Sequence, residues 1–166
     1  MTITVPSGVT STLDISSGEL VVVLSGGELL DSTILGGGSA TLSSGAIASD
    51  LIVSAGGTLI GPGDLVSVDY VVGFVSGVAV SGVLQLYGSA SDVTLLPTSL
   101  LDGSGIATGT IVMDGALLEN GIAVDSQVES GGRELISSGA VGSGDTIGSG
   151  GVLQVELGGS AADEAV

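Results

Sequence analysis

Glycine recurs at a nearly constant interval along this chain of 166 residues, and this constrains the fold more than any other feature. One series consists of Gly26, Gly45, Gly63, Gly82, Gly103, Gly121, Gly139 and Gly158. A second series begins at Gly18, Gly37 and Gly56 and resumes at Gly77, Gly115, Gly132 and Gly151. A fixed period of this length is typical of repeat proteins, in which each repeat stacks on the next. We therefore expect about eight to nine stacked coils of about 19 residues each.

The segments between the glycines have the composition of short β-strands. Runs such as "ELVVVL", "DLIVS", "TIVM" and "VLQVEL" are separated by Ser-Gly or Gly-Gly pairs. Val, Ile, Leu and Thr favour strands, and glycine adopts the positive φ values of tight corners. No apolar stripe with a helical period persists, so helices are disfavoured. The predicted fold is all-β: a single-stranded right-handed parallel β-helix, or β-solenoid, whose coils lie ~4.8 Å apart.

Apolar residues that recur in every coil should form an interior ladder along the solenoid. We assign to this ladder Leu42, Ile47, Val53, Leu59, Val83, Ile111, Leu117, Ile136, Val141 and Leu153.

One domain, residues 1–166, accommodates the whole pattern. We expect an N-terminal cap over residues 1–16, because Pro6 and the mixed polar pattern around it would blunt an open strand edge. Residues 17–159 hold the repeats, and residues 160–166 form an acidic tail or the start of a further coil. The opening "MTITVPSGVTSTLD" has neither the basic nor the apolar region of a signal peptide, so we expect export, if it occurs, to depend on other sequence.

The charge balance excludes several partners. Eighteen acidic residues stand against one basic residue, Arg133, which gives a net charge of -17. Nucleic acid is excluded because phosphate binding depends on Lys and Arg, and anionic membranes are disfavoured by the same repulsion. The uncharged run from Tyr70 to Ser91 has the length of a membrane helix, but its glycines and serines and its flanking Asp69 and Asp92 indicate buried strands without membrane insertion.

Most catalytic classes lack their residues here. The absence of Cys and His removes zinc sites and nucleophilic triads, and the absence of Lys removes a phosphate-binding P-loop. We expect no enzymatic activity and no cofactor. A carbohydrate-active β-helix enzyme is the alternative, since a glycosidase needs only paired carboxylates, but two Tyr, one Phe and no Trp give little material for a sugar-binding cleft.

Acidic residues recur with the same period as glycine. Asp31, Asp50 and Asp69 are each one repeat apart and should stack on one face, and Asp125, Asp145 and Glu164 resemble a continuation. Stacked carboxylates would repel one another or recruit divalent cations, so these three aspartates are weak metal candidates, with simple solvation as the other interpretation. A calcium-stabilised repeat is a second alternative, although "GSGDTIGSGG" and "GPGDLVSVD" lack the nine-residue spacing of calcium β-rolls.

The stretch "LSGGELLDSTILGGGSATLSSGAIASDLIVSAGGTL" resembles the AIDA-type repeat of bacterial autotransporter adhesins. The resemblance covers residues 12–59 well, residues 110–166 less closely and residues 64–109 only loosely. It implies an exported passenger at the bacterial cell surface or outside the cell, which mediates adhesion, self-association or biofilm formation. Its partners would be other copies of the chain, or glycans and proteins of a cell surface.

In some members of that family, serines at the corners carry heptose added by a dedicated glycosyltransferase. The corner serines that match are Ser25, Ser44, Ser130, Ser138 and Ser149. The simpler role of such a serine is a local hydrogen bond to the corner backbone.

Overall fold

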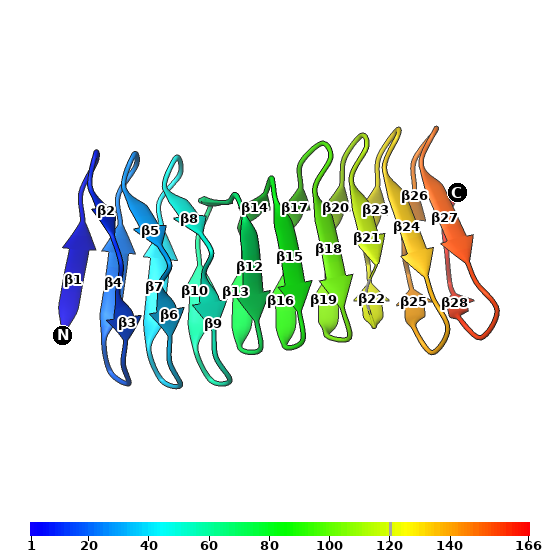
Figure 1. Ribbon diagram of the computed structural model, residues 1–166. Helices are drawn as coiled ribbons and strands as arrows, with labels where there is room; N and C mark the ends of the chain where they lie inside the picture. The colour runs from blue at the N-terminus through cyan, green and yellow to red at the C-terminus, as the bar shows by residue number, and fades with distance from the viewer. Residues whose placement is uncertain (120) are drawn as a thin grey trace.

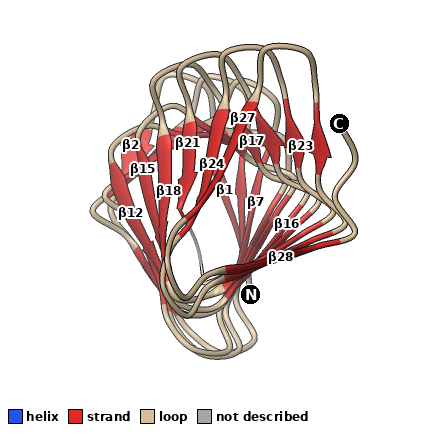
Figure 2. Cartoon of the chain, turned by 90° about the vertical axis from the view of Figure 1, so that its right-hand side faces the viewer, coloured by secondary structure: helices blue, strands red, loops and turns tan. Residues whose placement is uncertain are grey.

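The computed structural model describes residues 1–119 and 121–166 and is a β-solenoid (Figure 1). These residues form 28 short strands and no helix. The strands make three parallel sheets, one with ten strands and two with nine, so the chain completes about nine coils. Viewed along its length, the solenoid has three sides, one for each sheet (Figure 2). None of the described residues lies in a helix with the length and apolarity needed to cross a membrane.

Each sheet takes one strand from every coil. Sheet A contains β1 (Thr2–Val5), β4 (Leu20–Val23), β7 (Ser39–Leu42), β10 (Thr58–Ile60), β13 (Phe74–Ser76), β16 (Ser89–Ser91), β19 (Ile106–Thr108), β22 (Ile122–Val124), β25 (Val141–Ser143) and β28 (Ser160–Ala162). Sheet B contains β2 (Thr10–Ser11), β5 (Glu28–Leu30), β8 (Ile47–Ser49), β11 (Asp64–Leu65), β14 (Ala79–Val80), β17 (Thr94–Leu95), β20 (Ile111–Val112), β23 (Gln127–Val128) and β26 (Thr146–Ile147). Sheet C contains β3 (Asp14–Ile15), β6 (Thr33–Ile34), β9 (Ile52–Val53), β12 (Val68–Val71), β15 (Val83–Leu86), β18 (Leu100–Gly103), β21 (Leu117–Glu119), β24 (Arg133–Ile136) and β27 (Val152–Val155).

The interior is filled by ladders of small and branched apolar side chains. In sheet B, for example, the residues that pair in successive coils are all buried: Leu29, Ala48, Leu65, Val80, Leu95, Val112, Val128 and Ile147. Alternate residues of each strand point inward, as the two-residue period of a strand requires. Burial of these ladders is the main favourable contribution to folding, because each inward side chain packs between its counterparts in the coils on either side.

The expected ladder is right at some positions and wrong by one residue at others. Leu42, Val53, Leu59 and Ile136 are buried, and Leu153 is partly buried against the core. Ile47 and Val141 are exposed, while Val83, Ile111 and Leu117 are half-buried on the outer faces. In each of these five cases the inward residue is the next one in the sequence: Ala48, Gly142, Leu84, Val112 and Leu118. A shift of one residue exchanges the two faces of a strand, and large apolar residues on both faces hide this parity in the sequence.

The lengths of the coils differ because the corners differ. We call the corners A–B, B–C and C–A after the sheets that they join. Leu20 pairs with Ser39 and Ser39 with Thr58, so these coils have the expected length. Thr58 pairs with Phe74 and Phe74 with Ser89, so the next two coils are shorter. In the shortest coil each corner has two residues, 77–78, 81–82 and 87–88, whereas the longer coils contain corners of four residues such as 43–46.

The glycine series therefore does not follow a single corner of the solenoid. Gly26 and Gly45 stack at the A–B corner, where the Gly26 amide donates to the Gly45 carbonyl across 2.8 Å. Gly82 lies at the B–C corner, Gly103 lies in β18, and Gly139 lies at the C–A corner. The number of residues between successive glycines is nearly constant only because these glycines occupy different corners, while the middle coils contain fewer residues.

The two ends of the solenoid have regular strands. Residues 1–16, where a cap is expected, contain β1, β2 and β3 and form the first coil, and β1 pairs with β4 in register. At the other end β28 pairs with β25, and Thr146 bridges to Ala165, so residues 160–166 contain the beginning of a further coil.

Close approach of neighbouring coils predicts which glycines tolerate a side chain. A methyl group on Gly103, which has φ +143°, would overlap the Leu86 carbonyl of the preceding coil. Gly18 has φ +77° but no atom within 4 Å of the position of a Cβ. We expect Gly18→Ala to cost about 1–2 kcal/mol of left-handed backbone strain and Gly103→Ala to cost clearly more, because the coils must also separate. Urea unfolding of both variants measures the difference, and equal losses would contradict the close packing at Gly103.

Candidate functional site

The five corner serines all lie on the outside of the solenoid. Ser25 and Ser44 are at A–B corners, Ser130 and Ser149 are at B–C corners, and Ser138 is at a C–A corner. Every one of them is exposed and lies in a corner of four residues. They do not form one column, because the A–B corners have four residues in the first coils and the B–C corners have four in the last ones.

A serine at such a corner is matched to a glycine in the following coil. The Ser25 Oγ is 2.9 Å from the point where a Cβ of Gly45 would lie, and the Ser138 Oγ is 2.7 Å from that of Gly158. The hydroxyl thus occupies space that a side chain on the next coil would need. Ser7 and Ser17 lie in the same way over Gly26 and Gly37 and are also exposed. Sequence reasoning missed these two, although their Ser-Gly steps carry the same signal.

The predicted ladder of three aspartates is wrong at Asp69. Asp31 and Asp50 occupy B–C corners of successive coils with φ values of 48° and 54°, and the Asp31 amide donates to the Ser49 carbonyl. In the next coil Ser67 takes the place beside Asp50 and donates its Oγ to the Asp50 carboxylate across 3.0 Å. Asp69 is instead an inward residue of β12, because the A–B corner of this coil has three residues, 61–63, where the preceding coil has four, 43–46.

Asp69 belongs to the column of inward residues of sheet C, in which leucines follow it. It pairs with Leu84, and the column continues through Leu101 and Leu118. Its Oδ1 accepts a hydrogen bond of 2.8 Å from the Leu51 amide. Burial raises the pKa of Asp69 to about 7, and repulsion by the carboxylates of Asp50 and Asp64 adds to the effect, while the Leu51 hydrogen bond opposes it. Asp69 is therefore an interior group and does not belong to a surface ladder.

A second interior carboxyl group follows at the other end of this column. Glu134 pairs with Leu118 and is buried close to Asp145, which accepts a hydrogen bond of 2.7 Å from the Ser126 amide. Burial raises the pKa of Glu134 to about 8, and the charges of Asp145 and Glu164 raise it further. Burial also raises the pKa of Asp145.

Asp145 and Glu164 lie in neighbouring coils, as their spacing predicted, and the Asp145 amide donates to the Glu164 carboxylate across 3.0 Å. Asp125 does not join them, because it stacks on Gly144 at the A–B corner. Within residues 1–119 and 121–166, no three Asp, Glu, His or Cys side chains are grouped closely enough to hold a metal ion.

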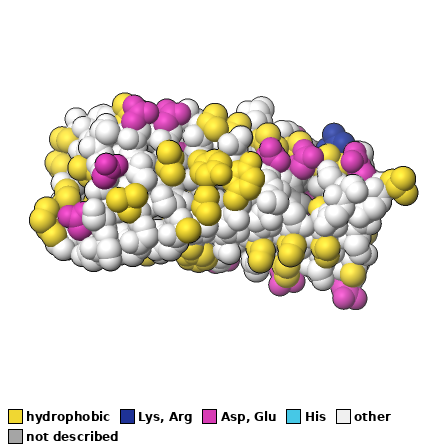
Figure 3. All heavy atoms as spheres, turned by 60° about the horizontal axis from the view of Figure 1, so that its bottom comes forward, with side chains coloured by type: hydrophobic (Ala, Val, Ile, Leu, Met, Phe, Trp, Pro, Cys, Tyr) yellow, Lys and Arg dark blue, Asp and Glu magenta, His cyan; other side chains and the backbone are white. Residues whose placement is uncertain are grey.

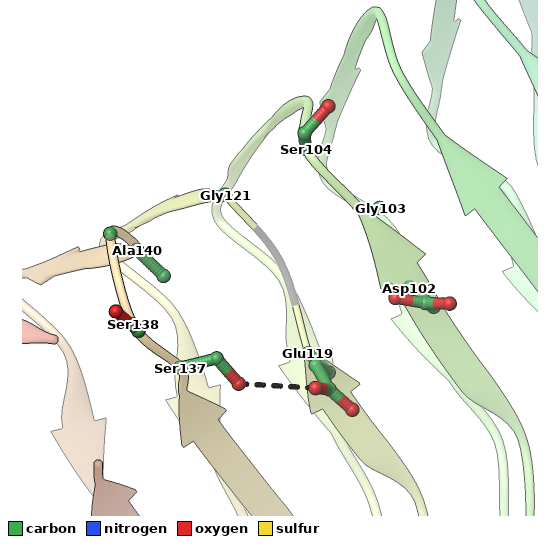
Figure 4. A pocket seen from close by; sticks show the side chains of 9 residues that line it. Asp102, Gly103, Ser104, Glu119, Gly121, Ser137, Ser138 and Ala140 are labelled. Atoms are coloured by element: carbon green, nitrogen blue, oxygen red, sulfur yellow. Dashed lines mark hydrogen bonds between the residues drawn. The ribbon is translucent and has the colours of Figure 1, made fainter. Parts of the chain in front are cut away.

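The outer surface has a hollow of about 250 Å³ at the C–A corner. Its lining consists of Asp102, Gly103, Ser104, Glu119, Gly121, Ser137, Ser138, Gly139 and Ala140. Asp102 and Glu119 are register partners on the outer face of sheet C. Ser137 points toward Glu119 and donates its Oγ to the Glu119 Oε1 across 3.1 Å (Figure 4).

A step in the corner size produces this hollow. The C–A corner has two residues at 104–105 and four at 137–140, so the later corner stands out from the surface beside the earlier one. Gly103 and Gly121 add no side chains, and a Cβ on either would meet backbone of the preceding coil. Asp102 and Glu119 thus face an open recess whose far wall contains Ser137 and Ser138.

Exposed apolar side chains gather near the middle of the rod (Figure 3). The rings of Tyr70 and Tyr87 are 5.0 Å apart and inclined by 35°. They are 38% and 46% exposed, and Val72 and Phe74 beside them in the sequence are each 38% exposed. Every aromatic residue of the chain therefore lies within the two coils that contain β12–β15 and their adjoining corners.

The chain was compared with protein families, curated proteins and solved structures. No protein-family profile matches the chain, and no curated protein matches it. Among solved structures, the chain is similar to the crystal structure of the TibC-catalysed hyper-glycosylated TibA fragment 55–350. The similarity covers 99% of this chain and 88% of that chain, with 21% sequence identity and a TM-score of 0.35. A likeness at this level carries no argument about function, which has to come from the residues of this chain.

Proposed function

We propose that this chain is a structural and adhesive β-solenoid module of an exported bacterial surface protein, located at the cell surface or outside the cell. It acts by adhesion or self-association through its outer faces, and its partners are other copies of the chain or components of a cell surface. The resemblance of residues 12–59 to the AIDA-type repeat is consistent with this proposal.

One observation carries the proposal. The interior is filled along the whole solenoid by buried ladders, so a partner can bind only on the outside. On the outside, exposed apolar side chains recur in successive coils, for example Ile106, Ile122 and Val141 of sheet A, which are 43%, 38% and 38% exposed. A contiguous exposed apolar surface on a soluble protein is typical of a site of interaction.

The corner serines are proposed as sites of glycosylation. Ser25, Ser44, Ser130, Ser138 and Ser149 are exposed at projecting corners, where a transferase could reach them, and Ser7 and Ser17 share this geometry. A sugar on Ser25, Ser130 or Ser138 would lie beside a glycine of the next coil, which has no side chain to block it.

A carbohydrate-active enzyme is the second candidate, and one observation favours it. Asp102 and Glu119 lie on adjacent strands, which are ~4.8 Å apart, close to the ~5–5.5 Å between the carboxyl groups of retaining glycosidases. We nevertheless propose a module without enzymatic activity, since the described residues provide an open recess and no cleft around the pair. Release of new reducing ends from oligosaccharides, abolished by Glu119→Gln, would favour the enzyme instead.

The adhesive function can be tested with beads. Beads that carry the purified protein should aggregate with one another or attach to bacterial or epithelial cells, and the double variant Ile106→Ser, Val141→Ser should weaken this because it removes exposed apolar surface without touching the core. Beads without protein provide the control, because the unfolded core variant Leu101→Asp would expose apolar side chains and aggregate for that reason alone. Folded wild-type beads that neither aggregate nor attach better than this control would contradict the proposal.

A further inference from the structure

We infer that a strip on the outer surface of sheet C binds a neutral oligosaccharide; this inference rests on the proposed adhesive function and names a class of ligand for it. The strip begins at Tyr70 and Tyr87 and ends in the hollow beside Glu119. Between these points it passes Gln85 and Asp102.

The tyrosine pair forms the apolar end of the strip. Tyr70 points outward from β12, and Tyr87 follows β15 in the next coil, so their rings contact each other on the outside of the rod. A tyrosine ring offers a flat apolar face together with a hydroxyl group that stays accessible to hydrogen bonds. The apolar C–H face of a pyranose ring can stack on such a surface while its hydroxyl groups remain solvated or bind neighbouring polar groups.

Polar groups continue the strip at regular intervals. Tyr70 pairs with Gln85, Gln85 with Asp102, and Asp102 with Glu119, so these four outward side chains lie on four successive strands of sheet C. Successive strands are ~4.8 Å apart, which is close to the length of one sugar unit, so an extended chain along the rod would place about one unit on each strand. The amide of Gln85 donates and accepts hydrogen bonds, and the carboxylates of Asp102 and Glu119 accept them from sugar hydroxyls.

The hollow closes the strip at its far end. Its 250 Å³ is below the ~300–1,000 Å³ of pockets that enclose a drug-sized ligand, so it accommodates one ring while the rest of the ligand lies along the surface. Ser137 holds Glu119 by the Oγ–Oε1 hydrogen bond and so fixes the carboxylate against the recess (Figure 4). A fixed acceptor loses less conformational freedom on binding than a mobile one.

The charge of the protein selects against acidic glycans. The net charge is -17, and the strip itself contains Asp102 and Glu119. Sialylated, sulfated or uronic sugars would be repelled both at a distance and at these two residues. The ligand class that fits an aromatic pair, an amide and two carboxylates is therefore a neutral oligosaccharide of several units.

The test is titration calorimetry of the purified protein with defined sugars. The neutral probes are cellotetraose, maltotetraose, mannotetraose and tetra-N-acetylchitotetraose, and the anionic probe is tetragalacturonate. We expect at least one neutral tetrasaccharide to bind, its monosaccharide to bind more weakly, and tetragalacturonate not to bind. Tyr70→Ala should weaken binding about tenfold, and Glu119→Gln should weaken it in the same direction.

Two control variants separate loss of the strip from general damage. Gln127→Ala and Glu28→Gln change exposed or half-exposed groups of sheet B and should leave binding unchanged. The inference is overturned if no neutral probe binds, if tetragalacturonate binds as tightly, or if the strip variants bind like the wild type. Bead adhesion that persists without any saccharide binding overturns the strip alone, whereas saccharide binding without bead adhesion contradicts the proposed function and leaves the strip standing.

Discussion

The protein should unfold at a clearly higher temperature at pH 5 than at pH 8.5. Burial raises the pKa of Asp69 from 3.8 to about 7 and that of Glu134 from 4.5 to about 8. Because both pKa values are raised in the folded state, folding takes up protons at every pH between the unfolded and the folded pKa values. The resulting stability is fully present below the unfolded pKa values near 4 and is lost as the pH rises through 7 to 8. Thermal unfolding followed by circular dichroism across this range measures the effect.

Substitution of the buried carboxyl groups should remove this pH dependence. Asp69→Asn keeps an oxygen that can accept from the Leu51 amide but carries no charge. At pH 8.5 the raised pKa of Asp69 corresponds to a loss of roughly 4 kcal/mol in the free energy of unfolding. The substitution should regain this amount, less about 1–3 kcal/mol if the new amide NH₂ has no acceptor. We expect Asp69→Asn and Glu134→Gln to stabilise the protein at pH 8.5 and to change it little at pH 5. Asp31→Asn, at an exposed corner away from both buried carboxyl groups, is the control; equal melting temperatures of wild type at both pH values would refute the assignment.

Replacement of Leu101 by Asp should abolish stable folding, whereas the same change at Leu100 should be tolerated. The two residues are neighbours in β18, but Leu101 is fully buried between Leu84 and Leu118, while Leu100 is half-buried on the outer face. A new unpaired carboxylate inside the column loses the packing of a leucine and must be desolvated or protonated, at a cost of more than about 4 kcal/mol.

Urea unfolding of both variants at pH 8, where a solvated aspartate is ionised, measures this difference directly. Leu100→Asp should lose no more than about 1 kcal/mol, because its carboxylate remains in water. Similar losses in the two variants would mean that the inner and outer faces of β18 have been assigned wrongly. The buried carboxyl group of Asp69 is met by the Leu51 amide, which donates to its Oδ1.

The class of fold follows from the sequence because its signals are local. Short β-branched runs between glycines specify strands and corners, and their repetition specifies stacking, so the all-β solenoid of about nine coils was predictable and is confirmed. It was harder to predict from the sequence which face of each strand points inward. Ile47 and Val141 are as apolar as the residues that point inward, so hydropathy alone does not distinguish the two faces.

The candidate site was only partly predictable for a related reason. Exposed corner serines such as Ser25 and Ser138 are recognisable from their Ser-Gly steps. The hollow depends instead on a difference between corners two coils apart, which bring Asp102, Glu119 and Ser137 together. The assumption of a constant period also placed Asp69 beside Asp50, and it failed there because the corners after Thr58 become shorter. The number of residues between two positions predicts whether they stack in neighbouring coils only where the corner sizes are known.

The four-residue corners lie at different edges in the two halves of the rod, so its two ends differ although the same three sheets run through both. Near the N-terminus such corners, at 24–27 and 43–46, project from the A–B edge, and near the C-terminus those at 129–132 and 148–151 project from the B–C edge. The short coil that contains β13–β15 separates the two arrangements. A large molecule that approaches along either of these two edges therefore meets projecting corners from only one half of the chain. Two different large partners can therefore bind one rod at the same time, each at its own edge, without steric overlap.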